Sequence, residues 1–225
     1  METDMGESRV KVRKMKMAID EKQLKERLFQ IAEDNVFIQG WLHNDAGAFL
    51  YQLVRFHAPV PIVVELGSWK GRSTSWLASG IKDRGEGQVY AIDTWQGTPG
   101  EMEHEHLLKG YNPDQLFHEF LQNMRQLELI EWTTPIRMDT LTAAKQWIQE
   151  RPDTEIGLLF IDAGHEYEQV LHDFEYWSPM VAKKGFIIFD DVPAWPGPTK
   201  VVFEMPRWYR QVGTTPNNVA FQKTV

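Results

Sequence analysis

The sequence predicts an α/β protein with a mostly parallel sheet, helices on both faces of the sheet, and a C-terminal antiparallel hairpin. Short apolar runs without polar alternation recur along the chain, as is typical of strands that are buried on both faces. Stretches with helical periodicity alternate with these runs, which indicates parallel strands. The last two runs are separated only by a short segment around Gly213, which favours a hairpin.

Residues 19–56 precede the first expected strand and have helical periodicity. Apolar residues recur three and four positions apart in two stripes, separated by a Gly-containing apolar link at residues 36–42. The members of the stripes are Leu24, Leu28, Ile31, Ala48, Leu50, Leu53 and Val54. Residues 1–18 contain five basic side chains and no apolar run, so we expect a flexible basic tail there. The alternative, an arm that contacts an acidic partner, has no second feature in its favour.

Five strand-and-helix units follow. Strands are expected at residues 61–66, 88–93, 132–138, 156–161 and 184–189. The helices expected after them cover residues 73–81, 113–129, 141–150, 167–177 and 201–205. Two more strands, at 207–212 and 218–223, form the hairpin and bring the expected sheet to seven strands. No linker or repeat interrupts this series, so we expect residues 19–225 to form a single domain with an N-terminal helical extension.

The composition excludes several classes of protein. The 225 residues include no cysteine, which rules out disulfides, thiolate metal sites and a cysteine nucleophile. A formal net charge of -8 argues against a protein that binds nucleic acid over a broad basic face. The sequence contains no apolar run of about 20 residues, the length that a membrane-spanning helix needs. We therefore expect a cytoplasmic protein without nucleic-acid or membrane partners.

A glycine-containing turn follows the first expected strand, at the end of the sheet where ligands bind in open α/β proteins. Glu65 lies near the end of the strand, and the turn contains Gly67, Ser68 and Gly71. Neither the Gly-Lys-Ser/Thr ending of a phosphate loop nor the three glycines of a dinucleotide fingerprint is present. Asp93 ends the second strand, where an acid hydrogen-bonds the hydroxyls of a ribose. Together these residues favour an adenosine-type cofactor without a pyrophosphate, although each alone could be a cap or a turn residue.

These motifs resemble those of a known family. The pattern Glu65-x-Gly67-x-x-x-Gly71 is similar to the first motif of the class I S-adenosylmethionine-dependent methyltransferases, and Asp93 falls at the position of their ribose-binding acid. The expected order of elements resembles their Rossmann-like seven-stranded sheet. Within this class, the sequence resembles a small-molecule branch akin to the macrocin O-methyltransferases and the cephalosporin hydroxylase-like proteins. The segments that carry this second resemblance are residues 40–42, 67–74, 161–168, 190–191 and 195–198.

The resemblance implies a methyltransferase that uses S-adenosylmethionine and a small-molecule acceptor of the sugar or natural-product type, methylated at a hydroxyl. It implies that the methionine part of the cofactor lies by Gly67 and Ser68, and that its carboxylate lies at the N-terminus of the helix that Ser73 opens. It places Asp139 and Thr140 near the adenine. The cofactor-binding residues that it implies are Glu65, Gly67, Ser68, Gly71, Ser73, Asp93, Asp139, Thr140 and Asp162.

Two tryptophans are candidates for a wall of this site. They are Trp41, in the link before the first strand, and Trp95, in the loop after the second strand. The alternative for both is ordinary packing in the core.

Acidic residues follow the fourth and fifth strands. Asp162 comes after one strand, and Asp190 and Asp191 come after the other. Neighbouring parallel strands lie about 4.8 Å apart, so these carboxylates can converge and raise each other's pKa. A divalent cation such as Mg²⁺ would relieve this repulsion, and the related families that bind a metal hold it here. The alternative is that Asp190 caps a turn and Asp191 is solvated, and Ala163 departs from the commoner Asp-x-Asp-His pattern of those families.

His165 is the candidate general base, with Asp162 beside it as the second catalytic residue. An imidazole titrates near neutral pH and can take the proton of a hydroxyl that attacks a methyl group. The alternative is that His165 forms a local hydrogen bond that opens the following helix. The acidic and histidine-containing run at residues 101–106 resembles a metal site in composition, but we expect it to form a lid on the substrate side.

A second function remains open from the sequence. In this alternative, the protein has the methyltransferase fold but another role, which is either metal-dependent and hydroxylase-like or regulatory. The two-histidine, one-carboxylate set of iron oxygenases is not apparent, because only His165 joins the acids, and this favours the methyltransferase. The acceptor could be a sugar, a phenol, a polyketide or an amine. The N-terminal helical region could pack on a second subunit of a homo-oligomer.

Overall fold

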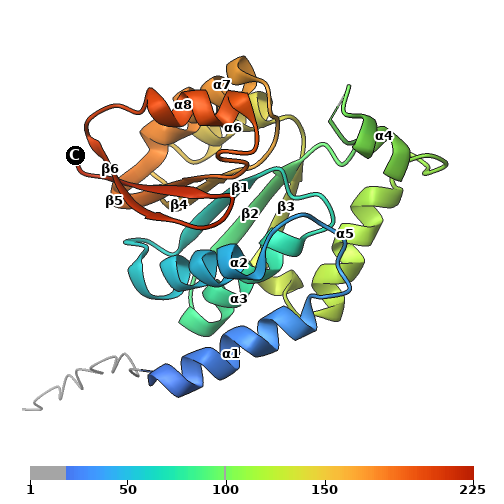
Figure 1. The fold of residues 1–225 in the computed structure, drawn as a ribbon, viewed down its shortest axis with the longest axis horizontal. Coiled ribbons are helices and arrows are strands. Elements are labelled where there is room, and N and C mark those ends of the chain that lie inside the picture. The colour runs from blue at the N-terminus through green and yellow to red at the C-terminus, as the bar shows by residue number, and fades with distance from the viewer. Residues whose placement is uncertain (1–18, 99) are drawn as a thin grey trace, which may run out of the picture.

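The computed structural model describes residues 19–98 and 100–225, so the tail expected at residues 1–18 lies outside the described residues. Seven strands form one sheet in the order β3-β2-β1-β4-β5-β7-β6 (Figure 1). The first five strands are parallel, and β7 pairs antiparallel with both β5 and β6. The strands are β1 (Ile62–Leu66), β2 (Gln88–Asp93), β3 (Thr133–Arg137), β4 (Ile156–Ile161), β5 (Val181–Phe189), β6 (Tyr209–Thr214) and β7 (Val219–Lys223). The predicted fold class is therefore confirmed.

Helices cover both faces of this sheet. On one face lie α1 (Glu21–Asp34), α2 (Asn44–Gln52), α3 (Arg72–Arg84) and α5 (Gln115–Gln126). On the other face lie α6 (Thr140–Glu150), α7 (Tyr167–Trp177) and α8 (Pro196–Phe203). A short helix, α4 (Met102–Leu107), lies beyond the carboxyl ends of the strands, and single irregular turns occur at Leu53–His57, Ile130–Trp132 and Ser178–Met180. Two separate hydrophobic cores result, one on each face of the sheet.

Several expected boundaries differ from the structure, and two of these differences have a local reason. The last helix before the hairpin begins at Pro196 and not at residue 201. Proline fits the first turn of a helix because the N–H that it lacks has no partner there in any residue. Strand β5 begins at Val181 and not at residue 184, and it carries the exposed pair Lys183 and Lys184, which hides its apolar pattern. Lys184 has a positive φ of 67°, and the register with β4 shifts near this point.

The strand order places a ligand-binding position between β1 and β4. The chain passes from β1 to β2 on one side of β1, and β4 pairs with β1 on the other side. The carboxyl ends of β1 and β4 therefore flank a crevice. Gly67, directly after β1, is required here. Its φ is +86°, and a Cβ at this position would lie 2.0 Å from the carbonyl oxygen of Asp162, directly after β4. The glycine lets the two strand ends approach each other.

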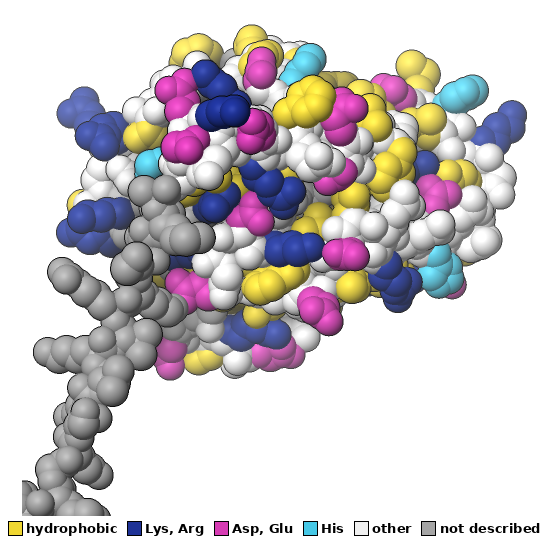
Figure 2. Space-filling model, turned by 90° about the horizontal axis from the view of Figure 1, so that it is seen from below, with side chains coloured by type: hydrophobic (Ala, Val, Ile, Leu, Met, Phe, Trp, Pro, Cys, Tyr) yellow, Lys and Arg dark blue, Asp and Glu magenta, His cyan; other side chains and the backbone are white. Residues whose placement is uncertain are grey.

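Figure 2 shows the surface that faces downward in Figure 1. Lys, Arg, Asp and Glu side chains are intermixed on it, with no single basic patch among the described residues in this view. Within the same described residues, no helix combines the length and the apolar character needed to cross a membrane.

Candidate active site

A cleft of about 1080 Å³ opens at the carboxyl ends of the parallel strands. Most of the predicted site residues line this cleft, namely Trp41, Gly67, Ser68, Ser73, Asp93, Asp139, Thr140, Asp162, His165, Asp190 and Asp191. They come from the loops after all five parallel strands and from the link between α1 and α2. Three predicted residues do not line it: Glu65, Gly71 and Trp95.

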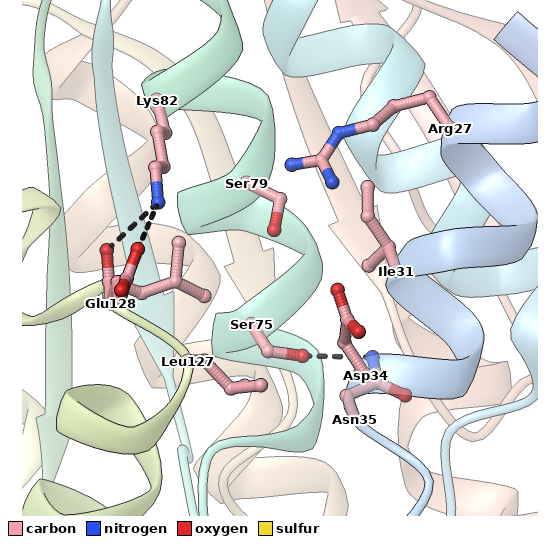
Figure 3. Close-up of a pocket in the computed structure, with 10 residues that line it drawn as sticks. Arg27, Ile31, Asp34, Asn35, Ser75, Ser79, Lys82, Leu127 and Glu128 are labelled. Carbon is pink, nitrogen blue, oxygen red and sulfur yellow. Dashed lines mark hydrogen bonds and ion pairs between the residues drawn. The ribbon is translucent and has the colours of Figure 1, made fainter.

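A second cavity, of about 150 Å³, lies between α1, α3 and residues 127–129 (Figure 3). Several of its polar side chains are already paired: Lys82 contacts Glu128, and the side-chain amide of Asn35 forms a hydrogen bond with Ser75 Oγ at 2.9 Å. It is too small for a nucleoside, and we therefore place the active site in the larger cleft.

Asp93 ties the turn after β1 to the loop after β2. One carboxylate oxygen accepts hydrogen bonds from the backbone N–H groups of Ser68 and Trp69, both at 2.8 Å, and the other accepts from Trp95 N at 2.6 Å. Burial raises the pKa of Asp93, and the three N–H donors oppose this rise. The residue that the sequence assigns to the ribose thus also holds the glycine turn in its conformation.

Glu65 lies beneath this turn and not on the cleft. Its side chain is fully buried and accepts hydrogen bonds from Ser68 Oγ at 2.7 Å and from the hydroxyl of Thr74. Its other oxygen, Oε1, has no hydrogen-bond partner among the described residues. Burial raises the pKa of Glu65 to about 7 in spite of the hydroxyl donors. Glu65 therefore supports Ser68 from below.

Gly71 and Trp95 also have packing roles. Gly71 precedes α3 with a φ of +92°, and a Cβ there would lie 2.6 Å from Met124 Cε. Trp95 is 1% exposed, packs on Phe120 with ring centroids 4.8 Å apart, and donates from Nε1 to Trp69 O. Trp41 is the tryptophan of the predicted pair that lies on the wall of the cleft.

Asp139 and Thr140 lie at the start of α6. Asp139 is the N-cap of this helix, and its side chain accepts a hydrogen bond from Thr142 N at 2.9 Å, which lowers its pKa. Asp173 on α7 lies nearby, almost fully buried, and burial raises its pKa to about 6. No local pattern in the sequence points to Asp173, because it lies within an expected helix and next to no strand end.

The acids after β4 and β5 converge as predicted. Asp162, His165 and Asp191 each offer one ligand atom, and these atoms lie within 4.8 Å of one another, a spacing that suits a metal ion. Asp190 lines the same cleft, but its carboxylate accepts hydrogen bonds from the amide of Asn218 and from Asp191 N. The structure therefore groups His165, and not Asp190, with the other two residues of the predicted metal set.

These carboxylates cannot all ionise easily. Burial, followed by the charges of Asp190 and Asp191, raises the pKa of Asp162 well above its usual value. Burial and the charge of Asp191 raise the pKa of Asp190 to about 7. Asn217, which the sequence analysis missed, donates to Asp191 Oδ1 at 2.8 Å and partly compensates this negative charge. A bound cation would favour the ionised forms further.

His165 is held among several side chains. Its Nε2 lies 2.6 Å from Asp191 Oδ2, its Nδ1 lies 2.8 Å from Glu101 Oε1, and its ring stacks on Trp195 with centroids 4.3 Å apart. Burial lowers the pKa of His165, but Asp191 and Glu101 outweigh this effect and raise it overall. The N-cap of the following helix α7 is Glu166, so His165 does not open that helix as the alternative interpretation supposed.

The first four residues of the acidic and histidine-containing run, 101–104, line the cleft. We call residues 100–108 the lid segment; it contains α4. Glu101, Glu103 and His104 lie on the cleft, and His104 stacks on Trp69 with centroids 4.6 Å apart. Glu105 and His106 are exposed. In the part of the chain that the structure describes, this run is not a cluster with metal-ligand spacing.

Comparison with known proteins identifies a family for this chain. Residues 64–192 match the family model described as a methyltransferase domain. An uncharacterised protein from Acanthamoeba polyphaga mimivirus is 33% identical over 168 residues, which cover 69% of this chain and 68% of that protein. An uncharacterised protein from Sinorhizobium fredii is 28% identical over 153 residues, 67% of this chain, but this chain spans only 15% of that protein.

The fold is shared with a solved enzyme. The O-methyltransferase TomG from Streptomyces achromogenes, which is involved in tomaymycin synthesis and was solved in complex with SAM, superposes with a TM-score of 0.58. The two chains are 13% identical, and the match covers 93% of each.

Proposed function

Because the chain belongs to the methyltransferase-domain family, we propose that it transfers the methyl group of S-adenosylmethionine to a hydroxyl of a small molecule, of the sugar or natural-product type. Residues 19–225 would act as one catalytic domain. The observation that carries this proposal is the large cleft at the carboxyl ends of the strands, with the glycine turn after β1 on one side and His165 with its acids on the other.

The charge of the cleft fits this cofactor. Among the described residues that line it, nine are acidic and only Arg72 is a lysine or arginine. The guanidinium of Arg72 donates to the backbone carbonyls of Ile38 and Leu42, which occupy its donors. S-adenosylmethionine has a sulfonium and an ammonium group against one carboxylate, so its net positive charge complements these acids. TomG, solved with SAM, has the same fold.

We assign the cofactor contacts by position on the cleft. Gly67, Ser68 and Ser73 would hold the methionine part, and Asp93 the ribose. Asp139 and Thr140 would lie by the adenine, with Asp162 near the reacting end. Glu65 and Gly71 would act from beneath, through the conformation of the turn.

The protein's part in the reaction is to align the acceptor and remove its proton. The cofactor supplies an electrophilic methyl group when it is bound. His165 would take the proton of the acceptor hydroxyl as the oxygen forms its new bond to the methyl carbon and the bond from that carbon to the cofactor sulfur breaks. Asp191 Oδ2, at 2.6 Å from Nε2, would stabilise the imidazolium that results.

A divalent cation such as Mg²⁺ fits the acids after β4 and β5. Asp162 and Asp191 would hold it, with Asp190 beside them, and the raised pKa values of Asp162 and Asp190 reflect burial and a mutual repulsion that a cation would relieve. Such a cation would attract the acceptor oxygen and lower the pKa of its hydroxyl. The alternative hydroxylase-like role lacks support, because the one metal-type cluster among the described residues contains a single histidine.

Calorimetric titration with S-adenosylmethionine and S-adenosylhomocysteine, each with and without Mg²⁺, tests this proposal. We expect both compounds to bind at one site per chain. A folded protein that binds neither would overturn it. A panel of hydroxylated acceptors with radiolabelled methyl donor would then identify the substrate class.

A further inference from the structure

We infer that Glu101 is a positioning residue for His165, and that the same carboxylate fastens the lid segment over the cleft. This inference rests on the proposed function, because it assumes that His165 takes a proton from the acceptor. Glu101 joins the lid segment to His165, so the imidazole is fully oriented only when the lid segment is in its closed position.

The carboxylate of Glu101 reaches toward two histidines. Its Oε1 lies 2.8 Å from His165 Nδ1, and its Oε2 lies 3.2 Å from His104 Nδ1. The Glu101 side chain is 19% exposed. It is the N-cap residue of α4 but makes no capping hydrogen bond to the backbone of that helix, so its carboxylate is left to contact the two histidine rings.

His165 is the stronger of the two partners. His104 Nδ1 already accepts a hydrogen bond from Thr98 N at 3.1 Å, so a neutral His104 has no proton there to share with Glu101. Burial lowers the pKa of His104, which favours this neutral form. By contrast, the Glu101 carboxylate lies closer to His165 Nδ1, at 2.8 Å, than to His104 Nδ1, at 3.2 Å, and no backbone N–H donates to His165 Nδ1 among the described residues.

Glu101 Oε1 lies close to His165 Nδ1, but the two atoms are not aligned for a hydrogen bond. Nδ1 of His165 is buried and lies at ion-pair distance from Glu101, but it has no hydrogen bond of good geometry among the described residues. Catalytic hydrogen bonds are often poorly aligned before substrate binds, and a small rotation of the imidazole would align this one. Asp191 Oδ2 lies 2.6 Å from the other ring nitrogen, Nε2, so the two carboxylates contact the imidazole at both of its nitrogens and fix the plane of the ring.

Packing holds the lid segment only at its C-terminal end, where the partly buried Leu108 lies against the core. None of the six residues of α4 is buried, and Met102 is 83% exposed. Apart from Glu101, the lid is tied down by the stacking of His104 on Trp69 and by Trp41 Nε1, which donates to Glu103 at 3.1 Å. Polar contacts of this kind exchange readily with water, so the segment can open at low cost.

The other constraints on His165 belong to the sheet. Asp191 and Trp195 both follow β5, and a Cβ at Gly197 would lie 2.1 Å from His165 O, which shows how closely α8 packs on this loop. Glu101 instead comes from the lid segment. Opening of the lid would therefore remove one of the side chains that orient the imidazole and leave the others in place.

The first measurement needs neither cofactor nor acceptor. His165 is labelled with diethyl pyrocarbonate and followed by mass spectrometry in the wild type, in Glu101→Gln and Glu101→Ala, and in Glu105→Gln as a control on the exposed side of α4. The exposed His106 is the internal reference. We expect labelling of His165 to be about tenfold faster in Glu101→Ala, because a charge-assisted contact of the lid is lost, and unchanged in Glu105→Gln. Equal protection of His165 in Glu101→Ala and wild type would overturn the inference.

The second measurement is a double-mutant cycle in the methyl-transfer assay. Glu101→Ala should lower kcat about 10- to 100-fold with the dissociation constant of S-adenosylmethionine within about threefold, and Glu101→Gln should recover part of this loss. In the His165→Ala background, Glu101→Ala should have little further effect, because it acts through the ring. Fully additive losses would overturn the positioning role.

These two readouts also separate this inference from the proposed function. A wild-type protein that binds no S-adenosylmethionine would refute the proposed function and the orientation of a base. The labelling of His165 would still decide whether Glu101 fastens the lid.

Discussion

The carboxylate of Asp93 accepts a hydrogen bond from the backbone N–H of Ser68 at 2.8 Å, and this contact joins the ends of β2 and β1. Both residues lie on the cleft. An acid that the sequence assigns to ligand binding is therefore also part of the scaffold of the site. Substitutions here will affect stability and cofactor affinity together, and experiments must measure both.

For Asp93→Ala we expect at least a tenfold loss of affinity for S-adenosylmethionine, because a charge-assisted contact is worth about 1.5–3 kcal/mol. The melting temperature should also fall, since three backbone N–H groups lose their acceptor. Calorimetry and thermal unfolding measure the two effects, with the exposed Asp45→Ala as the control. Unchanged affinity in a folded Asp93→Ala protein would contradict the assignment.

For His165→Ala we expect turnover to fall about 10²–10⁴-fold, the usual contribution of a positioned base, with little change in cofactor affinity. The base must be unprotonated to act, and its pKa is raised above the ordinary 6.5 of histidine. The rate should therefore rise with pH through a midpoint above that value, and this rise should be absent in the mutant. The measurement is a pH–rate profile of the wild type and of His165→Ala. An identical profile in the mutant would show that His165 is not the general base.

Chelation tests the cation site. If Asp162 and Asp191 hold Mg²⁺, excess chelator should abolish turnover and added Mg²⁺ should restore it. Binding of Mn²⁺, followed by its paramagnetic effect on water, should weaken at least about tenfold in Asp162→Asn and remain normal in Asp45→Ala. Full activity in chelator would show that the acids contact the substrate or support the fold instead.

Glu65 should make stability depend on pH. Its pKa is raised to about 7 in the folded protein, against the ordinary 4.5. Between these two values the folded protein binds more protons than the unfolded protein, so stability should fall as pH rises from about 5 to 8. Glu65→Gln should flatten this fall, whereas the exposed Glu105→Gln should not. Melting temperatures in matched buffers measure the effect, and an equal slope in Glu65→Gln and wild type would contradict the prediction.

Much of the architecture could be predicted because its signals are local. The apolar runs at β1 and β4, the glycine at position 67 and the acids at positions 93, 162, 190 and 191 are visible in the sequence as neighbours along the chain. A parallel sheet then brings the ends of its strands to one edge, so these residues were expected in one cleft, and they line it. The sites of cofactor contact themselves stay predictions.

The direction of each side chain was decided by tertiary packing. Glu65 and Trp95 lie in the predicted strand-end segments, yet the first is directed beneath the turn and the second into the core against Phe120. A strand alternates its side chains between two faces, and only the packed helices determine what each face meets. The sequence also supplied no reason to join Gly67 with the backbone of Asp162, a contact across two strands.

The sequence by itself determined the fold class, the order of strand and helix, and which chemical groups stand at the carboxyl ends of the strands, because these depend on the periodicity of nearby residues. Only the tertiary structure decided the partners of those groups. Glu101 meets His165, and Asn218 meets Asp190, through loops far apart in the chain. Such contacts depend on how the loops pack over the sheet, and no local pattern in the sequence encodes that packing.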